Sequence, residues 1–395
     1  MQPEKQIEIA KRFLAHIDRG TTDVVDGVYR NPVSSYTSEE QLARERELLF
    51  RRQPLLVGFS CQIPNAGDYL TDDFAPTPIL VVRSSSGAAR AFANVCRHRG
   101  SRIAESFGRG VKCFVCPYHA WTYALDGSVA AIPDAYGFEG IDRSAYGLRE
   151  LPLVERHGLV WVVPEPGAHL DLAEVVGDLD DELAAYEFGS YHYYTTRVIR
   201  RAMNWKLVVD TFGEAYHLKP LHRSTVAPIF YQNVAVCRSH GLSHSMVLAR
   251  RSIDTLREED QARWKLIPHA ATVYVLFPNT VLTVQGDHVD VLRVYPDRDR
   301  VDRCVMYVDW YVPEAPSGDK AIAYWDKNVD LFLRTVNDED FTIGEGIQRG
   351  FASGAQTHLT YGRYEAPLQY YHRALQRALR SNGAAGHGPR DGERA

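Results

Sequence analysis

The sequence predicts an α+β protein in which a small all-β domain precedes a larger domain, an antiparallel sheet with helices on one side. Three observations support this prediction. The chain has 395 residues, which is enough for two domains. Short β-rich runs alternate with turns in residues 54–163, and Pro164 to Gly167 is the expected domain boundary. Beyond that boundary, strands are grouped apart from helices, which is typical of α+β folds.

The N-terminal segment and the small domain are expected at residues 1–50 and 51–165. The first should be mostly helical and pack on the larger domain, because residues 4–17 are amphipathic and the Ser-Glu-Glu sequence at Ser38 is a helix start. The expected strands of the all-β domain are residues 79–84, 91–96, 112–116, 121–124 and 159–163.

The larger domain is expected at residues 166–380. It should begin with a helical acidic stretch at 173–187 and a strand at 191–200, followed by a helix that carries residues 210–217. Four strands and two closing helices should follow, at residues 271–276, 280–285, 289–295, 304–312, 319–350 and 367–380. The last segment, 381–395, is rich in glycine, small and charged residues, so we expect a disordered tail.

The composition is that of a globular protein and excludes several classes of function. Hydrophobic residues make up 45% and charged residues 24% of the chain, and the formal net charge is −5. Arginines are scattered rather than gathered in a basic stripe, so no nucleic-acid partner is expected. No apolar run of about 18 residues predicts a membrane span, and early acidic residues argue against a signal peptide. We therefore expect a cytoplasmic protein with free thiols rather than disulfides.

Two short pairs of cysteine and histidine are the most informative feature of the chain. Cys96 and His98 form the first pair, and Cys116 and His119 form the second, each on a predicted loop between strands. Two thiolates with two imidazoles suit either a structural zinc ion or a [2Fe–2S] cluster that has both cysteines on one iron and both histidines on the other. Zinc fingers usually pair like with like, whereas each loop here offers one cysteine and one histidine. This mixed pairing favours the cluster.

A second group of ligand-type residues follows in the larger domain, at Asp210, Glu214, His217 and His222. If this stretch is helical, the spacing of the first three places them on one face. Burying three such groups together is costly unless they are paired or bind a metal. Pro220 disfavours continuation of the helix, which would free His222 to turn back toward His217.

A carboxylate in the last long helical stretch is the expected third ligand, because two histidines and one acid form the facial triad of non-haem iron sites. An apolar stripe in this stretch has one gap, at position 339 or 340, and an acid occupies both positions. A carboxylate inside a core-facing stripe indicates a partner such as a metal. The periodicity does not separate Glu339 from Asp340. The stripe consists of Trp325, Val329, Phe332, Val336, Ile343 and Ile347.

These two motifs, Cys-Arg-His with Cys-Pro-Tyr-His and then Asp-x3-Glu-x2-His-x4-His, resemble those of the α (catalytic) subunits of Rieske-type non-haem iron ring-hydroxylating oxygenases. The resemblance implies a Rieske [2Fe–2S] domain followed by a helix-grip catalytic domain that holds a mononuclear Fe(II). The family pattern Glu-Asp followed by Glu-x-x-Gln maps onto residues 339–340 and 345–348. It selects Asp340 as the iron ligand beside His217 and His222.

The resemblance also implies roles for two further acids and for partners. Glu214 stands where the family places an acid that bridges a cluster histidine of one subunit and an iron-ligand histidine of its neighbour. Asp210 is expected to orient a ligand histidine by a hydrogen bond. The protein would be a homotrimer (α3) or an α3β3 assembly that takes electrons from a reductase, with or without a ferredoxin, and uses O2 on a small organic substrate.

The substrate is open at this point. Hydroxylation of an aromatic ring by a dioxygenase or monooxygenase is the first interpretation, because it is the commonest activity of the family. The alternative is oxidative demethylation or C–N cleavage, for example of a quaternary ammonium compound, because Glu214 replaces the commoner aspartate. Arg293 and Arg349 are candidates to bind a substrate carboxylate. The candidate aromatic lining is Phe230, Tyr231, Phe277 and Trp310.

Two interpretations from other classes remain. A Rieske electron carrier of the ferredoxin type would not need the larger domain and its own ligand triad. A zinc-stabilised binding protein would be colourless and lack acid-labile sulfide.

Overall fold

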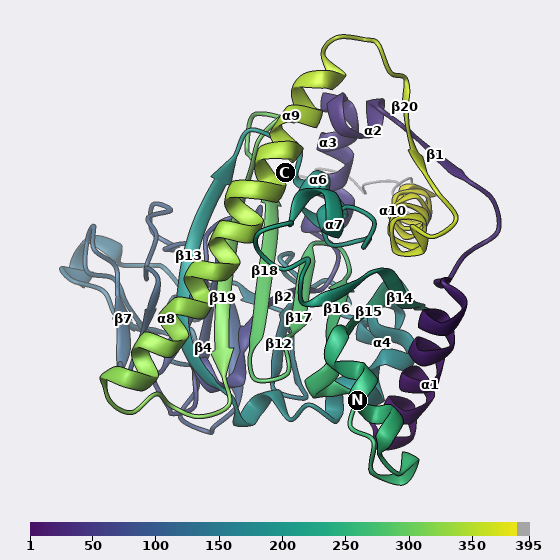
Figure 1. The fold of residues 1–395 in the computed structure, drawn as a ribbon. Helices are drawn as coiled ribbons and strands as arrows, with labels where there is room; N and C mark the ends of the chain where they lie inside the picture. Colours follow the sequence, from purple (N-terminus) through teal and green to yellow (C-terminus); the bar gives the residue numbers. More distant parts are fainter. Residues whose placement is uncertain (385–395) are drawn as a thin grey trace.

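A seven-stranded antiparallel sheet forms the centre of the molecule in the computed structural model, which describes residues 1–384 (Figure 1). The strand order is β13-β19-β18-β17-β16-β15-β14. The strands are β13 (His192–Arg201), β14 (Phe230–His240), β15 (Ser243–Arg250), β16 (Ala270–Leu276), β17 (Thr280–Val284), β18 (Val289–Pro296) and β19 (Cys304–Val312). The β14–β15 hairpin is absent from the sequence-based prediction, because its polar and histidine-rich residues hide the alternation of a half-buried strand.

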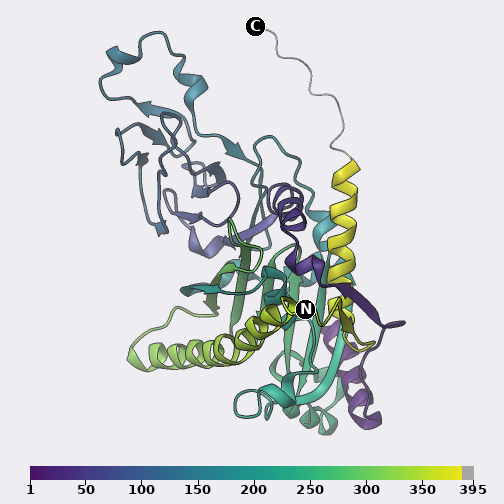
Figure 2. The same cartoon turned by 90° about the horizontal axis from the view of Figure 1, so that it is seen from above.

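The long helical rod and the C-terminal helix lie on one face of this sheet, and the small domain lies beyond the other face, as the two views together show (Figures 1 and 2). The longest helical rod consists of α8 (Asp319–Leu333), a π-helical turn (Arg334–Asp340) and α9 (Phe341–Phe351), and it crosses β13, β19 and β18. α6 (Trp205–Thr211) contacts both α9 and β18. α10 (Ala366–Ala384) packs on β15 and β14.

The π-helical turn rotates the buried face of the rod, so the prediction that Ile343 and Ile347 face the core is wrong. Ile343 and Ile347 are 51% and 41% exposed. A π turn adds a residue to the turn and rotates everything beyond it relative to an ideal α-helix. The residues that bury the second half of the rod are therefore Phe341, Gly344, Gln348 and Phe351.

Two other predicted segments also differ. The acidic stretch at 173–187 forms two short helices, α4 (Leu172–Val176) and α5 (Asp180–Ala184), rather than one. The predicted disordered tail begins too early, because α10 continues to Ala384; its remainder, residues 385–395, lies outside the described residues.

The small domain consists of three short antiparallel sheets with the strand orders β10-β5-β4-β3-β6, β7-β8-β9 and β11-β12-β2. Five of these strands, β4, β5, β7, β8 and β12, correspond to the five predicted runs. Their bounds are β2 (Leu55–Phe59), β3 (Tyr69–Asp72), β4 (Ile79–Arg83), β5 (Ala89–Ala93), β6 (Phe107–Gly108), β7 (Cys113–Val115), β8 (Thr122–Ala124), β9 (Val129–Ala131), β10 (Glu150–Leu151), β11 (Leu153–Arg156) and β12 (Leu159–Val162). All six cysteines of the chain are unpaired.

The N-terminal segment packs against the larger domain. α1 (Pro3–Arg19) contacts β14, and β1 (Tyr29–Pro32) pairs with β20 (His358–Tyr361). After α2 (Ser34–Thr37), the Ser38 side chain caps α3 (Glu39–Glu45) by accepting from the Gln41 amide. Among residues 1–384, no helix combines the length and the apolar composition that a membrane span requires.

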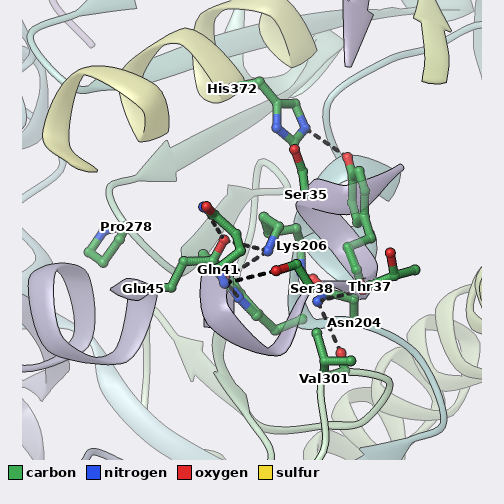
Figure 3. A network of polar contacts seen from close by, with 12 residues as sticks. Ser35, Thr37, Ser38, Gln41, Glu45, Asn204, Lys206, Pro278, Val301 and His372 are labelled. Carbon is green, nitrogen blue, oxygen red and sulfur yellow. Dashed lines mark hydrogen bonds and ion pairs between the residues drawn. The ribbon is translucent and has the colours of Figure 1, made fainter. Parts of the chain in front are cut away.

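A buried ion pair joins this segment to α6, the helix that precedes the histidine motif. Lys206 Nζ lies 2.7 and 2.8 Å from the two carboxylate oxygens of Glu45, and Trp205 Nε1 donates to the same carboxylate at 2.8 Å. Figure 3 shows the Glu45 and Lys206 side chains facing each other beside Asn204. Asn204 caps α6 by accepting from the Lys206 amide.

Candidate metal centres and substrate cavity

Two histidines flank a single helical turn in the larger domain. His217 immediately precedes α7 (Leu218–Leu221) and His222 immediately follows it. The turn brings their ring centroids to 5.1 Å from each other. Pro220 lies inside α7 and the helix ends one residue later, so His222 is free to face His217.

The predicted continuous helix through residues 210–217 is wrong. α6 ends at Thr211, and the chain turns at Gly213 before α7 begins. A Cβ at Gly213 would lie 2.5 Å from Leu368 Cδ2, so a larger residue at this turn would require the Leu368 side chain of α10 to move. Asp210 and Glu214 consequently point in different directions instead of sharing one helical face.

Asp340, at the end of the π-helical turn, completes a triad with these histidines. Its Oδ1 lies 3.1 Å from His222 Nε2 and 3.6 Å from His217 Nε2. One ligand atom from each of the three residues lies within 4.8 Å of the others. His222 and Asp340 are buried, so their polar atoms need a partner. Two imidazole nitrogens and one carboxylate oxygen are the donor set of a facial triad and fit a mononuclear Fe(II).

A glutamate holds the outer nitrogen of each histidine. Glu214 contacts His217 Nδ1 and also accepts from the His217 backbone amide at 3.0 Å. Glu339 lies 2.5 Å from His222 Nδ1 and accepts from Thr225 Oγ1 at 2.8 Å. These contacts leave each Nε2 directed at Asp340. Outer partners of this kind set the tautomer and orientation of metal-binding histidines.

The electrostatics of the triad favour a positive charge at its centre. Burial opposes the charged form of His217, but the Glu214 hydrogen bond and the charges of Glu214 and Asp340 outweigh it, so its pKa is raised. The pKa of His222 is raised in the same way, against burial, by Asp340 and Glu339. A divalent metal ion would take the place of the imidazole protons as the positive charge beside these carboxylates, because histidine binds metal in its neutral form.

The structure does not place Asp210 next to a ligand histidine. Its carboxylate accepts from Tyr36 OH at 2.5 Å and lies 2.8 Å from His372 Nε2, with Tyr361 OH at 3.4 Å. The prediction that Asp210 orients a ligand histidine is therefore corrected. Since α6 ends before Gly213, Asp210 faces the N-terminal segment and α10, and it joins them through a buried polar network.

The two cysteine–histidine pairs of the predicted cluster site, Cys96 with His98 and Cys116 with His119, lie on two adjacent tight loops. Cys96 and Cys116 are buried, whereas the histidine rings approach the surface, with their centroids 4.7 Å apart. Trp121 stacks on His98 with a centroid distance of 5.1 Å. This packing supports one side of the first loop.

The atoms of these loops fit a [2Fe–2S] cluster. His119 Nδ1 is buried and has no hydrogen-bond partner within the described part of the chain. Burial raises the pKa of Cys116, but backbone amides of Tyr118 and His119 outweigh it, so this thiol pKa is lowered. The Tyr123 hydroxyl lies 3.2 Å from Cys96 Sγ. Hydrogen bonds to the sulfur atoms are one means by which proteins set cluster potentials.

An apolar cavity of 310 Å³ opens from the triad under α8. Among the predicted aromatic residues, Phe230 lines it, whereas Tyr231, Phe277 and Trp310 do not. Phe277 and Trp310 belong to the buried core instead. The remaining apolar lining includes Phe212, Leu218, Met246, Leu248, Val273 and Phe332.

Neither predicted arginine reaches this cavity. Arg293 is buried in ion pairs with Asp72 and Asp309, at 2.7 and 3.0 Å. Arg349 lies on the exposed side of α9. The arginine that lines the cavity is Arg250, at the end of β15, in a strand that the sequence did not predict.

Comparison with known proteins identifies the family. Residues 53–142 match the Rieske [2Fe-2S] domain, and residues 188–381 match the catalytic domain of the ring hydroxylating alpha subunit. The chain is 36% identical over 376 residues to the glycine betaine monooxygenase oxygenase subunit of Chromohalobacter salexigens, across 85% of this chain and 82% of that one. The chain belongs to the Rieske ring-hydroxylating oxygenase family. This oxygenase therefore uses a Rieske [2Fe–2S] cluster and a mononuclear iron, which confirms the predicted cofactors and excludes the carrier and zinc-protein interpretations.

Other relatives of this Rieske oxygenase are similar over most of its length. Chloroplastic choline monooxygenase of Beta vulgaris is 28% identical, across 86% of this chain and 73% of that one. The quaternary ammonium Rieske monooxygenase CntA in complex with L-carnitine superposes with a TM-score of 0.76 at 21% identity, across 90% of this chain and 96% of that one. The predicted fold class, a Rieske domain followed by an α+β catalytic domain, is confirmed.

Two residues of this oxygenase's site are not assigned by the sequence patterns. The helical period treats Glu339 only as an alternative to Asp340, yet in the structure Glu339 contacts His222 Nδ1 and Asp340 contacts His222 Nε2. Two adjacent acids in a core-facing helix are a usable signal for this pair. Arg250 offers no comparable signal, because its position depends on the register of β15 against β16 and β14.

Proposed function

We propose that this oxygenase is a monooxygenase that oxidises an N-methyl group of a quaternary ammonium substrate. The observation that carries the proposal is the charge around the triad. Three carboxylates, Glu214, Glu339 and Asp340, lie within contact distance of the two histidines. Three negative charges against the two positive charges of Fe(II) leave this end of the cavity anionic, which favours a cationic substrate.

The lining of the cavity supports the same substrate class. A trimethylammonium group has no hydrogen-bond donors, so apolar walls suit its methyl groups. Phe212, Phe230 and Phe332 line the cavity, and aromatic faces attract quaternary ammonium ions. The named activities of the relatives, on glycine betaine and choline, agree with this class.

The residues of this chain have distinct tasks in the proposed reaction. Cys96, His98, Cys116 and His119 would hold the cluster, and His217, His222 and Asp340 would hold the iron. When bound, the two groups supply the electrons and the site for O2 activation. Glu214 and Glu339 keep the protons of the ligand histidines on Nδ1, and the apolar cavity excludes water from the reacting methyl group.

The overall reaction balances with two electrons from a reductase. One oxygen atom enters a C–H bond of the N-methyl group, and the other leaves as water after taking up two electrons and two protons. The hydroxymethyl ammonium product then breaks its C–N bond, releasing formaldehyde, a proton and the tertiary amine. The reductase, with or without a ferredoxin, is a required partner.

We propose a homotrimer in which the two cluster loops of one subunit, around His98 and His119, dock beside the His217–His222–Asp340 triad of the next subunit. The rings of His98 and His119 reach the surface next to Tyr118, which is 55% exposed. Near the triad, Tyr216 is 54% exposed beside Glu214. These two exposed patches lie on separate parts of the same chain, and a neighbouring copy would cover both.

A substrate panel tests the proposed reaction. Purified enzyme with full iron and sulfide content is supplied with electrons by a Rieske-system reductase and offered glycine betaine, carnitine, choline, biphenyl and naphthalene. We expect formaldehyde in step with O2 consumption from a quaternary ammonium compound and no product from the hydrocarbons. A cis-diol from either hydrocarbon, without formaldehyde from any ammonium compound, would establish the aromatic interpretation instead.

A further inference from the structure

Arg250 stands in an unusual environment on the wall of the substrate cavity. Its Nη2 donates to the backbone oxygen of Gln285 at 2.7 Å and to the side-chain oxygen of Gln285 at 3.3 Å. Its guanidinium carbon lies 5.7 Å from the centroid of the Phe230 ring. Its Nε is buried and has no hydrogen-bond partner among residues 1–384. One side of the guanidinium is thus held in place while another donor is left unused.

No carboxylate of the described chain forms an ion pair with Arg250. Arg83 and Arg293, which are more deeply buried, differ in this respect, since Arg293 pairs with Asp72 and Asp309, and Arg83 pairs with Glu155. Arg250 is half-buried, and partial burial of a guanidinium without a paired carboxylate is costly. Burial lowers the pKa of Arg250, although Asp287 partly opposes the shift. An anionic group in the cavity would remove this cost.

The two acids near this end of the cavity already have other partners. Asp287 accepts from Tyr324 OH at 2.6 Å and lies 2.7 Å from His288 Nδ1. Asp290 lies 3.5 Å from His288 Nε2 and accepts from Gln285 at 3.3 Å. His288 therefore lies between the two carboxylates, which leaves Arg250 available to an external anion.

The position of Arg250 suits a substrate with charges at both ends. Met246, Leu248 and Arg250 alternate along β15 and all face the cavity, with Arg250 about 13 Å along the strand from Met246. Apolar side chains separate the Arg250 guanidinium from the anionic triad. A zwitterion would therefore place its ammonium methyl groups at the triad and its carboxylate at Arg250.

We propose that Arg250 binds the carboxylate of the substrate, so that this oxygenase selects carboxylated quaternary ammonium compounds, the betaines, over ammonium alcohols. This inference rests on the proposed N-methyl oxidation for the cationic half of the substrate and goes beyond it for the anionic half. Arg250 is thus a specificity-determining residue. A bidentate guanidinium–carboxylate contact is the geometry that arginine favours.

Equilibrium binding to the anaerobic holoenzyme tests the role of Arg250. The probes are glycine betaine, choline and benzoate, titrated calorimetrically against wild type, Arg250→Met, Arg250→Lys and the control Arg251→Met. Arg251 is the exposed neighbour on the opposite side of the strand end. We expect Arg250→Met to weaken betaine binding by about 30-fold or more, with choline binding unchanged. Arg250→Lys should recover part of the loss, and Arg251→Met should bind all probes as wild type does.

The outcomes separate this inference from the proposed function. Arg250→Met that binds glycine betaine as tightly as wild type, with unchanged iron content and melting temperature, would overturn the role of Arg250. If wild type binds benzoate but neither ammonium compound, and Arg250→Met loses benzoate, the proposed function fails while the carboxylate site stands. If wild type binds none of the three probes, both fail.

Discussion

At the scale of single residues, the orientation of the two ligand histidines depends on two glutamates that lie on the far side of the rings from the expected iron. Glu214 and Glu339 each contact the Nδ1 atom of one ligand histidine, which directs the Nε2 atoms of both rings toward Asp340. Of these contacts, the one between Glu339 and His222 is fully internal to the catalytic domain. We therefore expect the contact between Glu339 and His222 to affect how tightly iron binds, but not the rate of electron transfer between subunits.

Replacement of Glu339 tests this division of tasks. Glu339→Gln removes the charge behind His222, so we expect iron affinity to fall by about 10- to 100-fold while the cluster stays intact. The matched control is Asp338→Asn, because Asp338 is the exposed acid one residue earlier. The measurement is iron retained against a graded chelator, with acid-labile sulfide as the internal reference. Equal iron loss in both variants would contradict the assignment.

A buried histidine makes a separate prediction about acid stability. Burial, with His240 and His372 nearby, lowers the pKa of His244 to about 3. Below about pH 6.5 the unfolded chain therefore binds a proton that the folded protein does not, and stability falls as the pH drops, by at most about 1.4 kcal/mol per unit. In His244→Asn, unfolding by denaturant should show a shallower pH dependence between about pH 6 and pH 4. An unchanged slope would exclude this contribution.

At the scale of elements, the histidine motif is anchored through α6 rather than through a long helix of its own. α6 is tied to the end of α3 by the buried pair of Lys206 and Glu45, both about 1% exposed. Asp210, at the other end of α6, is tied to α10 through His372. The Lys206–Glu45 pair and the Asp210–His372 contact thus fix both ends of α6, and with it the start of the turn that carries Glu214 and His217.

Breaking the buried pair should destabilise the fold. Lys206→Met leaves the Glu45 carboxylate buried with two neutral donors, Gln41 and Trp205, and no counter-charge, so we expect a loss of about 3–5 kcal/mol in the free energy of unfolding. Lys206→Met combined with Glu45→Gln should recover a large part of that loss, because no unpaired charge remains. Denaturant unfolding of the three proteins measures both effects. A single variant as stable as wild type would show that the pair does not anchor α6.

At the scale of the whole molecule, local patterns were predictable and long-range contacts were not. The cysteine and histidine pairs could be found because each spans only a few residues of one loop. His222 and Glu339 are 117 residues apart, so no spacing rule connects them. The exposure of Ile343 and Ile347 follows from a π turn that an ideal helical period cannot include. Arg250 depends on strand register, which emerges only when the sheet forms.

Electron transfer between subunits also belongs to this scale. In the proposed trimer, Glu214 receives a cluster histidine from the neighbouring subunit while it holds His217. Glu214→Gln can still accept from His217 Nδ1, so we expect both metal sites to remain filled while product from a single turnover of the reduced enzyme falls steeply. Metal content and product are measured on the same sample. Normal single-turnover product in Glu214→Gln would refute the bridging role.

A single turnover of the fully reduced wild-type enzyme, with a betaine labelled with 13C in its N-methyl groups, tests whether this oxygenase oxidises an N-methyl group. Enzyme with full iron and sulfide content is mixed with the labelled betaine and O2, and both the oxidation of the cluster and the products are followed. We expect labelled formaldehyde and the corresponding tertiary amine as the cluster is oxidised. A cluster that stays reduced, with the betaine recovered intact, would contradict it.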